Sequence, residues 1–598
     1  MKTSSEDIRR PRAGLLSGRL LLVIALCTSA FLAVQTLVVA NRTSGSSGFP
    51  LDDAWIHLQF ARNLHDFGTF SYFRNEMITA GSTSPLFTAL LAVGFFMTSN
   101  GVIVSYILGI TSILAAGVVM YRVAGEIFEG SSIAAVGSAA LLLLEPRLQW
   151  IALSGMETTL FILLFLATYF ALLRRLPVLL GATCGLMLWT RPDAIIAVAA
   201  IAGTILYERV VVRRTSTKKK RHQDATPEDL RWLKKAVGVF LVFAAAYAAF
   251  NLVLSGSLLP NTFAAKVKYY AGAKGSFPAE TFHFLADGHM VVPVILATIS
   301  VAGSVWWIGK RKRVRLLFPL LWSVGLFVSY WIDLPRLYQH GRYLMPLLPA
   351  VLLMSVDGAR ALVELAAQWI RSFRQGGVSH VVEGMILAAI VLQFGWTDVA
   401  SETAYAADCS YIGDRQVRTA LWIRDHLPKD AIIATHDIGA IAYYSERRVV
   451  DMVGLVSPEM INNIGRFDLL TQFLERSKVT YVAALKNWFE IANENPVFET
   501  DPLHPEVMEV YPFDPKRMHF TPQDATRLND AGEYYLSSGN AAAAMQLLKR
   551  SYTLDPRSAR TNFLLGVTLR TLNDTASSRQ MFRNARLLQP DYPGLPAQ

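Results

Sequence analysis

Long apolar stretches follow one another through the first two thirds of the chain, separated by short polar connections. A bilayer core of about 30 Å needs about 20 mostly apolar helical residues, and this pattern predicts about eleven membrane-spanning helices over residues 1–397. The stretches lie near residues 20–40, 102–121, 132–147, 157–173, 177–190, 193–208, 236–255, 289–308, 316–331, 343–357 and 381–397. A further apolar piece, Pro85–Met97, is shorter. We therefore expect a polytopic α-helical membrane protein.

The pattern changes after Trp396. Amphipathic runs at 415–427 and 468–477 alternate with short apolar runs that are typical of buried strands. These runs cover residues 431–435, 448–453 and 479–485. Alternation with short connections predicts a small α/β domain over residues 398–519.

Residues 520–598 contain a repeat with a period of 34. Matching positions are Gly532 and Gly566, Tyr535 and Leu569, Leu548 and Phe582, Ser551 and Ala585, and Pro556 and Pro590. Small residues at helix crossings, bulky residues in the core and a terminal proline resemble the tetratricopeptide helical hairpin. Two interpretations stay open: a module that binds a protein partner, or a helical cap on the α/β domain.

The composition agrees with a membrane protein. Of the 598 residues, 52% are hydrophobic and 17% charged, whereas soluble domains carry about 25% charged residues. Two short basic connections, at 213–221 and 310–315, together hold as many positive charges as the net excess of +11. Basic loops beside spans mark the cytoplasmic side, so the charge needs no nucleic-acid-binding face, and we expect no nucleic-acid partner. Three scattered cysteines exclude a disulfide framework or a zinc motif.

The basic loops also assign sides to the other connections. Arginines before the first span place the N-terminus inside, with the span as an uncleaved anchor in the inner (plasma) membrane, although a signal peptide shares this charge pattern. The first outer loop is then 41–83. Counting from the basic loops also places 155–157, 190–193, 256–288, 332–342 and the C-terminal part after 398 outside. The count is consistent only if the piece at 85–97 does not cross fully.

The first outer loop contains adjacent carboxylates, Asp52 and Asp53, just past a span. Unpaired charges there are unfavourable unless water, a cation or a metal compensates. From Asp52 onward the pattern is helical, and Asp53 and His57 share one face at i, i+4 spacing. The pair is therefore a candidate ligand set for a divalent metal ion such as Mg²⁺ or Mn²⁺. The structural alternative is that Asp52 caps the helix and Asp53 complements its dipole.

Several motifs, in order along the chain, resemble the GT-C superfamily of membrane glycosyltransferases, and within it the mycobacterial terminal arabinofuranosyltransferases. They are Asp52-Asp53-Ala54-Trp55-Ile56, Ala61-Arg62-Asn63, Ala80-Gly81-Ser82-Thr83-Ser84-Pro85-Leu86, Ser154-Gly155-Met156-Glu157-Thr158, Thr190-Arg191-Pro192-Asp193, Leu259-Pro260-Asn261-Thr262-Phe263, Gly341-Arg342-Tyr343-Leu344-Met345-Pro346 and His436-Asp437-Ile438-Gly439-Ala440. The resemblance covers about residues 20–490. Trp55, Gln59 and Phe60 depart from the family pattern, which leaves the donor and acceptor sugars open.

The resemblance implies transfer of a sugar from a polyprenyl-phosphate donor to a glycan or lipid hydroxyl on the outer side, within a setting of membrane lipids. It also implies that an acidic residue of the first outer loop is the catalytic base, often with a divalent metal ion nearby. We prefer Asp53 as this base, with Asp52 supporting the geometry or the metal.

The phosphate leaving group requires cationic partners where negative charge develops. The outer-side candidates for substrate binding are Arg191, Lys266, Lys268, Arg336, His340 and Arg342. Glu157 is a further candidate, which would support Asp53 from a neighbouring position. Each has a structural alternative. The lysines can extend along the membrane surface, Arg342 can anchor a span, and Glu157 can cap a helix.

Two other functions remain as alternatives, a transporter or flippase for a lipid-linked glycan and a non-catalytic scaffold of envelope assembly. Clear charges inside spans or inverted repeats, which would indicate a transporter, are not evident. In the α/β domain, Thr435-His436-Asp437 follows a strand, which is the usual place for site residues in such folds. Turn residues that start a helix are the alternative there.

Overall fold

The computed structural model divides into two compact units, Met1–Ser410 and Tyr411–Gln598, and each is described by itself. The structure describes residues 13–44, 48–73, 81–209, 227–256, 276–306, 314–334, 336–337, 339–370, 378–457, 459–460 and 466–596. The basic connection at 213–221, most of that at 310–315, and both Lys266 and Lys268 lie outside these residues.

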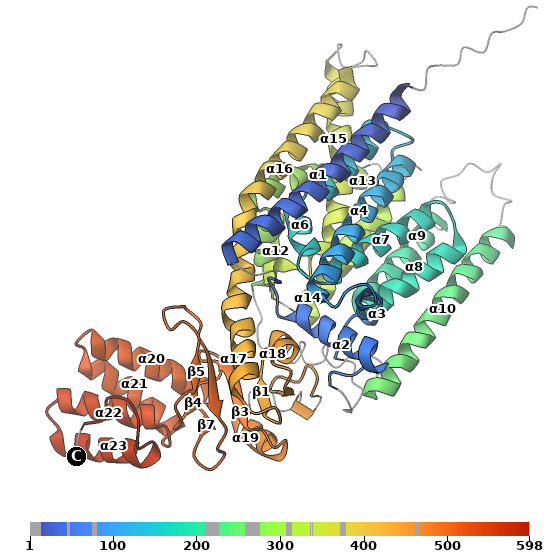
Figure 1. The fold of residues 1–598 in the computed structure, drawn as a ribbon. Coiled ribbons are helices and arrows are strands. Elements are labelled where there is room, and N and C mark those ends of the chain that lie inside the picture. The colour runs from blue at the N-terminus through green and yellow to red at the C-terminus, as the bar shows by residue number, and fades with distance from the viewer. Residues whose placement is uncertain are drawn as a thin grey trace, which may run out of the picture. The chain divides into compact units, whose positions relative to one another are not determined.

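The first unit is helical throughout its described part (Figure 1). Its α-helices are α1 (Ala13–Ser44), α2 (Asp53–Phe67), α3 (Pro85–Phe95), α4 (Gly101–Ile127), α5 (Ser132–Leu143), α6 (Pro146–Ala152), α7 (Thr158–Leu173), α8 (Pro177–Thr190), α9 (Ile195–Tyr207), α10 (Pro227–Ser255), α12 (Phe277–Leu285), α13 (Val291–Trp306), α14 (Leu317–Asp333), α15 (Leu348–Trp369) and α16 (Val378–Ile412). The expected apolar stretches lie on these helices. Helix α16 continues past residue 397, where the sequence suggested a domain boundary.

Several helices are long and apolar enough to cross a membrane, as expected of a multi-pass membrane protein. Among the described residues they are Gly18–Thr43, Gly101–Ile127, Arg231–Leu254, Gln339–Trp369 and Val378–His426. The helices Phe277–Leu285 and Gly288–Gly303 meet at 69° and would together make a sixth span, broken or re-entrant. The remaining apolar helices, including Pro85–Phe95, have 10–17 residues. The total of about eleven spans therefore stays a prediction.

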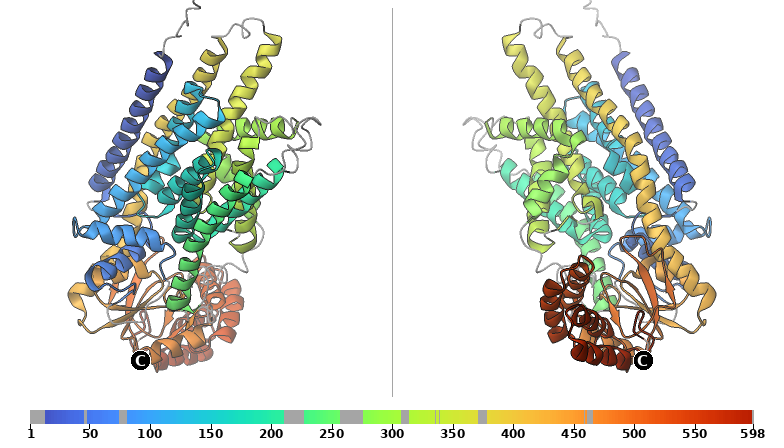
Figure 2. Two further views of the ribbon diagram at one scale, coloured as in Figure 1. Left: turned by 90° about the vertical axis from the view of Figure 1, so that its right-hand side faces the viewer. Right: turned by 90° about the vertical axis from the view of Figure 1, so that its left-hand side faces the viewer.

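The short helix α2 lies across the direction of α4 in the views of Figures 1 and 2. Its residues Trp55, Leu58 and Phe60 are fully buried, and α3 packs against it. The turn before α7 supports the start of α2. Gly155 has a φ of +73°, and a Cβ there would lie 2.8 Å from the Phe49 ring and 2.9 Å from Ala54. Glycine at position 155 therefore allows the turn before α7 to pack closely against the start of α2, where any side chain would collide.

Helix α4 approaches α6 closely at Gly109, where a Cβ would collide with the backbone carbonyl of Ala152. Gly109→Ala is therefore expected to lower stability by about 1–3 kcal/mol, the usual range for overpacking. Gly125 is a matched control on the same helix because a Cβ there meets nothing within 4 Å. Gly125→Ala should keep or slightly raise the thermal unfolding midpoint in detergent, since alanine favours helix. Equal midpoints for the two variants would contradict this packing argument.

The second unit contains α17 (Arg418–His426) and a five-stranded sheet. Its strands are β1 (Ile432–Thr435), β2 (Arg448–Asp451), β3 (Tyr481–Leu485), β5 (Phe498–Glu499) and β6 (Met508–Pro512), in the order β2-β1-β3-β6-β5. Strand β1 is parallel to both β2 and β3, while β6 is antiparallel to β3 and β5. A second pair, β4 (Ile491–Ala492) and β7 (His519–Phe520), is antiparallel. The expected strands correspond to β1, β2 and β3.

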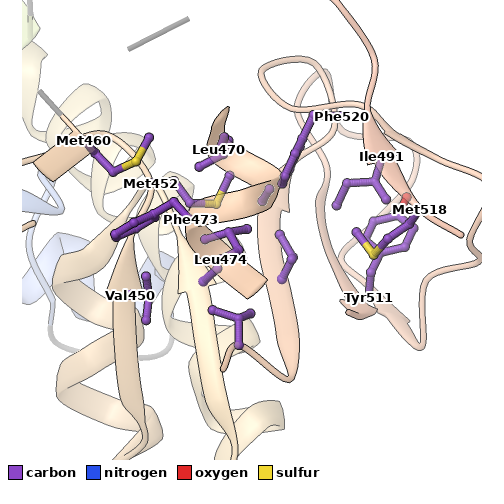
Figure 3. Packing of buried hydrophobic residues seen from close by; sticks show 14 residues of the cluster. Val450, Met452, Met460, Leu470, Phe473, Leu474, Ile491, Tyr511, Met518 and Phe520 are labelled. Carbon is purple, nitrogen blue, oxygen red and sulfur yellow. The ribbon is translucent and has the colours of Figure 1, made fainter. Parts of the chain in front are cut away.

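Two helices, α18 (Ile438–Ser445) and α19 (Phe467–Arg476), connect the parallel strands. Leu470, Phe473 and Leu474 of α19 join a buried cluster with Val450 and Met452 (Figure 3). Consecutive residues of β1, β2 and β3 are buried, which explains why these strands are continuous apolar runs in the sequence.

Four helices follow in the described C-terminal part, namely α20 (Gln523–Ser537), α21 (Ala541–Leu554), α22 (Ala559–Thr571) and α23 (Thr575–Leu588). They pack in pairs, α20 with α21 and α22 with α23. A Cβ at Gly532 would lie 2.7 Å from Leu548, and one at Gly566 would lie 2.7 Å from Phe582. The period of 34 therefore reflects the same crossing contact in two successive hairpins, although kinship with tetratricopeptide proteins stays a prediction.

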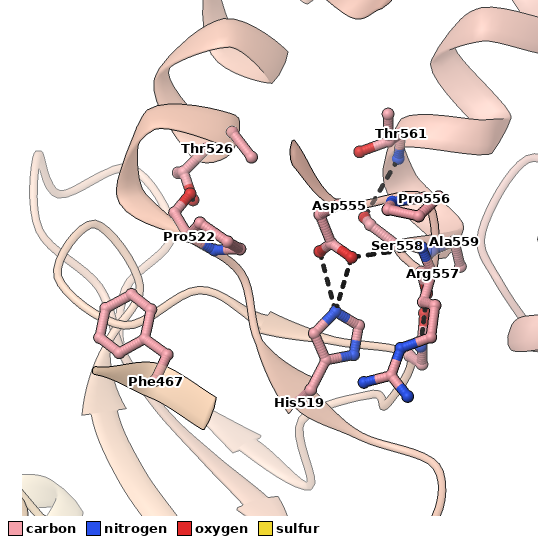
Figure 4. A network of polar contacts seen from close by, with 12 residues as sticks. Phe467, His519, Pro522, Thr526, Asp555, Pro556, Arg557, Ser558, Ala559 and Thr561 are labelled. Carbon is pink, nitrogen blue, oxygen red and sulfur yellow. Dashed lines mark hydrogen bonds and ion pairs between the residues drawn. The ribbon is translucent and has the colours of Figure 1, made fainter. Parts of the chain in front are cut away.

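Polar contacts join these helices to the strands (Figure 4). His519 Nε2 in β7 lies 2.8 Å from Asp555 Oδ2 between α21 and α22. Asn493 accepts a 2.8 Å hydrogen bond from the backbone N–H of Ala559, and Arg560 pairs with Glu490 at 3.2 Å. The cap interpretation expects such contacts, and a protein partner at the repeat stays a prediction.

Candidate functional site

The first acidic pair lies at the start of α2. Asp52 is at the N-cap position, but its side chain makes no capping hydrogen bond. Asp53 is the first residue of the helix, where its negative charge complements the helix dipole. Asp52 therefore lacks the side-chain hydrogen bond that defines a helix cap. The position of Asp53 in the first turn agrees with an interaction with the helix dipole.

Asp53 forms an ion pair with Arg342, which lies 289 residues later in the chain. The Arg342 side chain is 3% exposed and that of Asp53 21% exposed. Arg342 also donates to the hydroxyl of Tyr343 at 3.1 Å. The structure thus brings together two residues that the sequence proposed separately, one as base and one as cation.

Part of the Arg342 guanidinium has no hydrogen-bond acceptor among the described residues. Its Nε and NH1 groups are buried and have no hydrogen-bond partner among the described residues. Buried donors without acceptors are unfavourable by about 1–3 kcal/mol each. An anionic group with several oxygens, such as a phosphate, would satisfy them.

A second set of contacts links His57 to Arg191. His57 Nδ1 lies 3.1 Å from Ser82 Oγ, and its Nε2 lies 3.5 Å from Glu157 Oε2. Glu157 Oε1 in turn accepts from Arg191 NH1 at 3.4 Å. We call Ser82, His57, Glu157 and Arg191 the buried polar chain, since all four residues are buried. It connects α2 with the starts of α3 and α7 and the end of α8.

Two residues extend the buried polar chain beyond the sequence prediction. Arg191 NH2 donates to Asp193 Oδ2 at 2.9 Å and to the Tyr330 hydroxyl at 2.7 Å, and Tyr330 donates to Asp193 at 2.7 Å. Asp193 lies in the motif at 190–193 but was not proposed as a site residue. Tyr330 lies in an apolar stretch. A tyrosine there could have indicated a polar contact, because its hydroxyl needs a hydrogen-bond partner when it is buried.

Charge balance keeps Glu157 and Arg191 of the buried polar chain ionised. Burial alone would raise the pKa of Glu157, but the hydrogen bond with His57 and the positive charges of Arg191 and Arg342 lower it to about 2. Burial alone would lower the pKa of Arg191, but Asp193 and Glu157 hold it well above its usual range. Glu157 is therefore a carboxylate that balances two arginines, and its role in substrate binding stays a prediction.

The two proposed metal ligands, Asp53 and His57, have different partners among the described residues. Asp53 faces Arg342, whereas His57 lies between Ser82 and Glu157. Across the described residues, no group of three or more His, Cys, Asp or Glu side chains is arranged to hold a metal ion. A role for a divalent metal ion therefore stays a prediction.

Two of the other cationic candidates lie elsewhere. Arg336 is exposed and pairs with Glu280 on α12 at 3.2 Å. His340 points to α16, where its Nε2 lies 3.2 Å from Asp408 Oδ2. Lys266 and Lys268 lie outside the described residues, so their proposed contact with phosphate stays a prediction.

In the second unit, His436 and Asp437 follow the carboxyl end of β1. The His436 ring is buried against Trp488, with 5.5 Å between ring centroids, and burial lowers its pKa. Asp437 accepts a 2.7 Å hydrogen bond from Gln416. These contacts suit turn residues that start a helix.

Solved structures show the same architecture as this chain. An archaeal oligosaccharyltransferase, AglB from Archaeoglobus fulgidus, in complex with an inhibitory peptide and a dolichol-phosphate, matches with a TM-score of 0.52 at 13% identity, over 78% of this chain and 69% of its own. ArnT from Cupriavidus metallidurans, bound to undecaprenyl phosphate, matches with a TM-score of 0.52 at 14% identity, over 80% of this chain and 97% of its own. The chain shares the GT-C fold.

Two further comparisons are less informative. A mutant of the mycobacterial arabinofuranosyltransferase AftD matches with a TM-score of 0.42 at 15% identity, over 81% of this chain and 41% of its own, which does not establish the arabinofuranosyltransferase branch. A family model described as a domain of unknown function (DUF8728) matches residues 408–535. A search of curated protein sequences finds no match to this chain.

Proposed function

We propose that this protein is an integral-membrane glycosyltransferase that moves a sugar from a polyprenyl-phosphate donor to an acceptor hydroxyl on the outer side of the membrane. The Asp53–Arg342 pair carries the proposal, because it places a partly exposed carboxylate beside a buried guanidinium with two unpaired N–H groups. The GT-C fold supports it, since AglB and ArnT of that fold were solved with dolichol-phosphate and undecaprenyl phosphate.

Asp53 is the proposed general base. It accepts the proton of the acceptor hydroxyl while the acceptor oxygen bonds to the anomeric carbon of the donor sugar. The bond from that carbon to the phosphate oxygen breaks, and polyprenyl phosphate leaves with the bonding electrons. Arg342 stabilises the charge that develops on the phosphate. The buried polar chain holds α2 in place, so that Asp53 stays beside Arg342.

A transfer assay in proteoliposomes tests this function. Polyprenyl-phosphate sugars of several kinds are offered with a panel of glycan and lipid acceptors, with and without a chelator. Turnover of one donor would identify the sugar, and the chelator arm would show whether a divalent metal ion is required. Tight binding of donors without turnover on any acceptor would overturn the proposal and favour a transporter or an assembly scaffold.

A further inference from the structure

One face of α16 contacts three segments that carry the candidate site. Tyr405, Asp408 and Cys409 share this face at i, i+3 and i+4 spacing, and we call them the α16 anchor. The Tyr405 hydroxyl donates to the carbonyl of Leu153 at 2.9 Å, four residues before Glu157. Cys409 Sγ lies 3.7 Å from the carbonyl oxygen of Gly48, shortly before Asp52 and Asp53.

The third contact of the α16 anchor reaches the segment of Arg342. Asp408 Oδ2 accepts from Trp150 Nε1 at 3.0 Å and lies 3.2 Å from His340 Nε2. The rings of Trp150 and His340 also pack together, with centroids 4.8 Å apart. His340 is two residues before Arg342, so a single carboxylate of α16 holds the turn that presents the guanidinium.

This turn has an unusual backbone. Gln339, His340 and Gly341 have φ values of 50°, 58° and 70°, and residues with a Cβ rarely adopt this left-handed conformation. Such a backbone persists only where the surroundings determine it strongly, and it is frequent at functional sites. Here the surroundings are Asp408 on one side and Phe284 on the other, since a Cβ at Gly341 would lie 2.6 Å from the Phe284 ring.

We infer that Asp408 is a positioning residue, which holds the turn at 339–341 through His340 so that Arg342 faces Asp53. The inference rests on the proposed function, in which Arg342 contacts the donor phosphate. Asp408 itself touches neither Asp53 nor Arg342 in any contact of the described residues. Its effect must therefore pass through the turn.

The main test compares Asp408→Asn with wild type as full chains in proteoliposomes. Loss of the carboxylate charge should lower kcat/KM about tenfold, mainly through a higher KM for the polyprenyl-phosphate donor. Asp408→Glu should restore part of the loss. The effect should disappear in an Arg342→Lys background, because a residue that acts through Arg342 has nothing left to position. A tenfold loss that persists in that background would overturn the inference.

A second readout does not depend on transfer activity. The backbone N–H groups of Arg342 and Leu344 donate to Gln339 and Gly341, and their hydrogen exchange reports the order of the turn. Asp408→Asn should raise exchange over residues 339–345 several-fold. Asp66→Asn is the matched control, since Asp66 pairs with His65 at an exposed position of α2, and it should leave both readouts unchanged.

The two readouts separate the possible failures. Unchanged exchange over 339–345 in Asp408→Asn would overturn the positioning role, whatever the wild type transfers. If the wild type transfers no donor but exchange rises in the variant, the proposed function fails and the control of the turn by Asp408 stands.

Discussion

Asp53→Asn is expected to lower sugar transfer by about 100- to 10,000-fold, the range that a positioned general base contributes. Asparagine has nearly the same size as aspartate and still accepts a hydrogen bond from Arg342, but it cannot take the proton of the acceptor hydroxyl. The measurement is the initial rate of transfer in proteoliposomes with the donor that the wild type uses. The thermal unfolding midpoint in detergent is the folding control. It should fall, because the variant leaves the buried Arg342 guanidinium without its carboxylate partner, and the rates are compared where both proteins are folded.

Substitutions of two other carboxylates, one on the same loop and one on the same helix, test whether the effect is specific to Asp53. Asp52→Asn should reduce the rate less, because the structure places the Arg342 contact on Asp53. Asp66→Asn, at the exposed end of α2, should leave the rate unchanged. Full activity of Asp53→Asn with Asp52 intact would remove Asp53 from the mechanism, and a larger loss in Asp52→Asn would transfer the role of base to Asp52.

The sequence predicted the elements well wherever one local pattern dominates. The apolar stretches lie on helices, and the strands at 431–435, 448–453 and 479–485 correspond to β1, β2 and β3. Strands β4, β5 and β7 have only two residues each. They form because partner strands satisfy their backbone groups, and no local period indicates such contacts.

In the candidate site, too, contacts between distant segments could not be predicted from local patterns. Motif order suggested that Asp53, Glu157, Arg191 and Arg342 belong to one site, and their side chains do meet in two linked groups. Their pairing could not be predicted, because the contact between Asp53 and Arg342 depends on the packing of segments that are 289 residues apart. His340 and Arg336, in the same short loop, face Asp408 and Glu280 instead.

The buried charges explain why these motifs occur together. Glu157 and Asp193 lie against Arg191, and Asp53 lies against Arg342, so each buried guanidinium has a carboxylate partner. Removing one member of such a group leaves the rest buried without compensation, which is unfavourable by about 3–5 kcal/mol. The motifs are therefore expected to depend on one another for stability as well as for catalysis.

Arg191→Met is accordingly expected to lower the free energy of unfolding by about 3–5 kcal/mol at pH 7. Methionine fills most of the arginine volume, but Glu157 and Asp193 then lose their cation. In the wild type, the low pKa of Glu157, about 2, contributes stability that is fully present above the unfolded pKa of about 4.3 and is lost as the pH falls towards 2. The measurement is the thermal unfolding midpoint of the full chain in detergent at pH 7 and pH 5.

In Arg191→Met the burial of Glu157 is less compensated, so its pKa rises and protonation relieves the buried charge. The deficit of this variant relative to the wild type at the same pH should therefore shrink between pH 7 and pH 5. Arg174→Met is the matched control, because Arg174 pairs with Glu126 at a side-chain exposure of 55%, and such pairs contribute about 0–1 kcal/mol. Equal midpoints for Arg191→Met and Arg174→Met would show that the buried polar chain does not stabilise the helices around the site, and its role in holding α2 would then have to be abandoned.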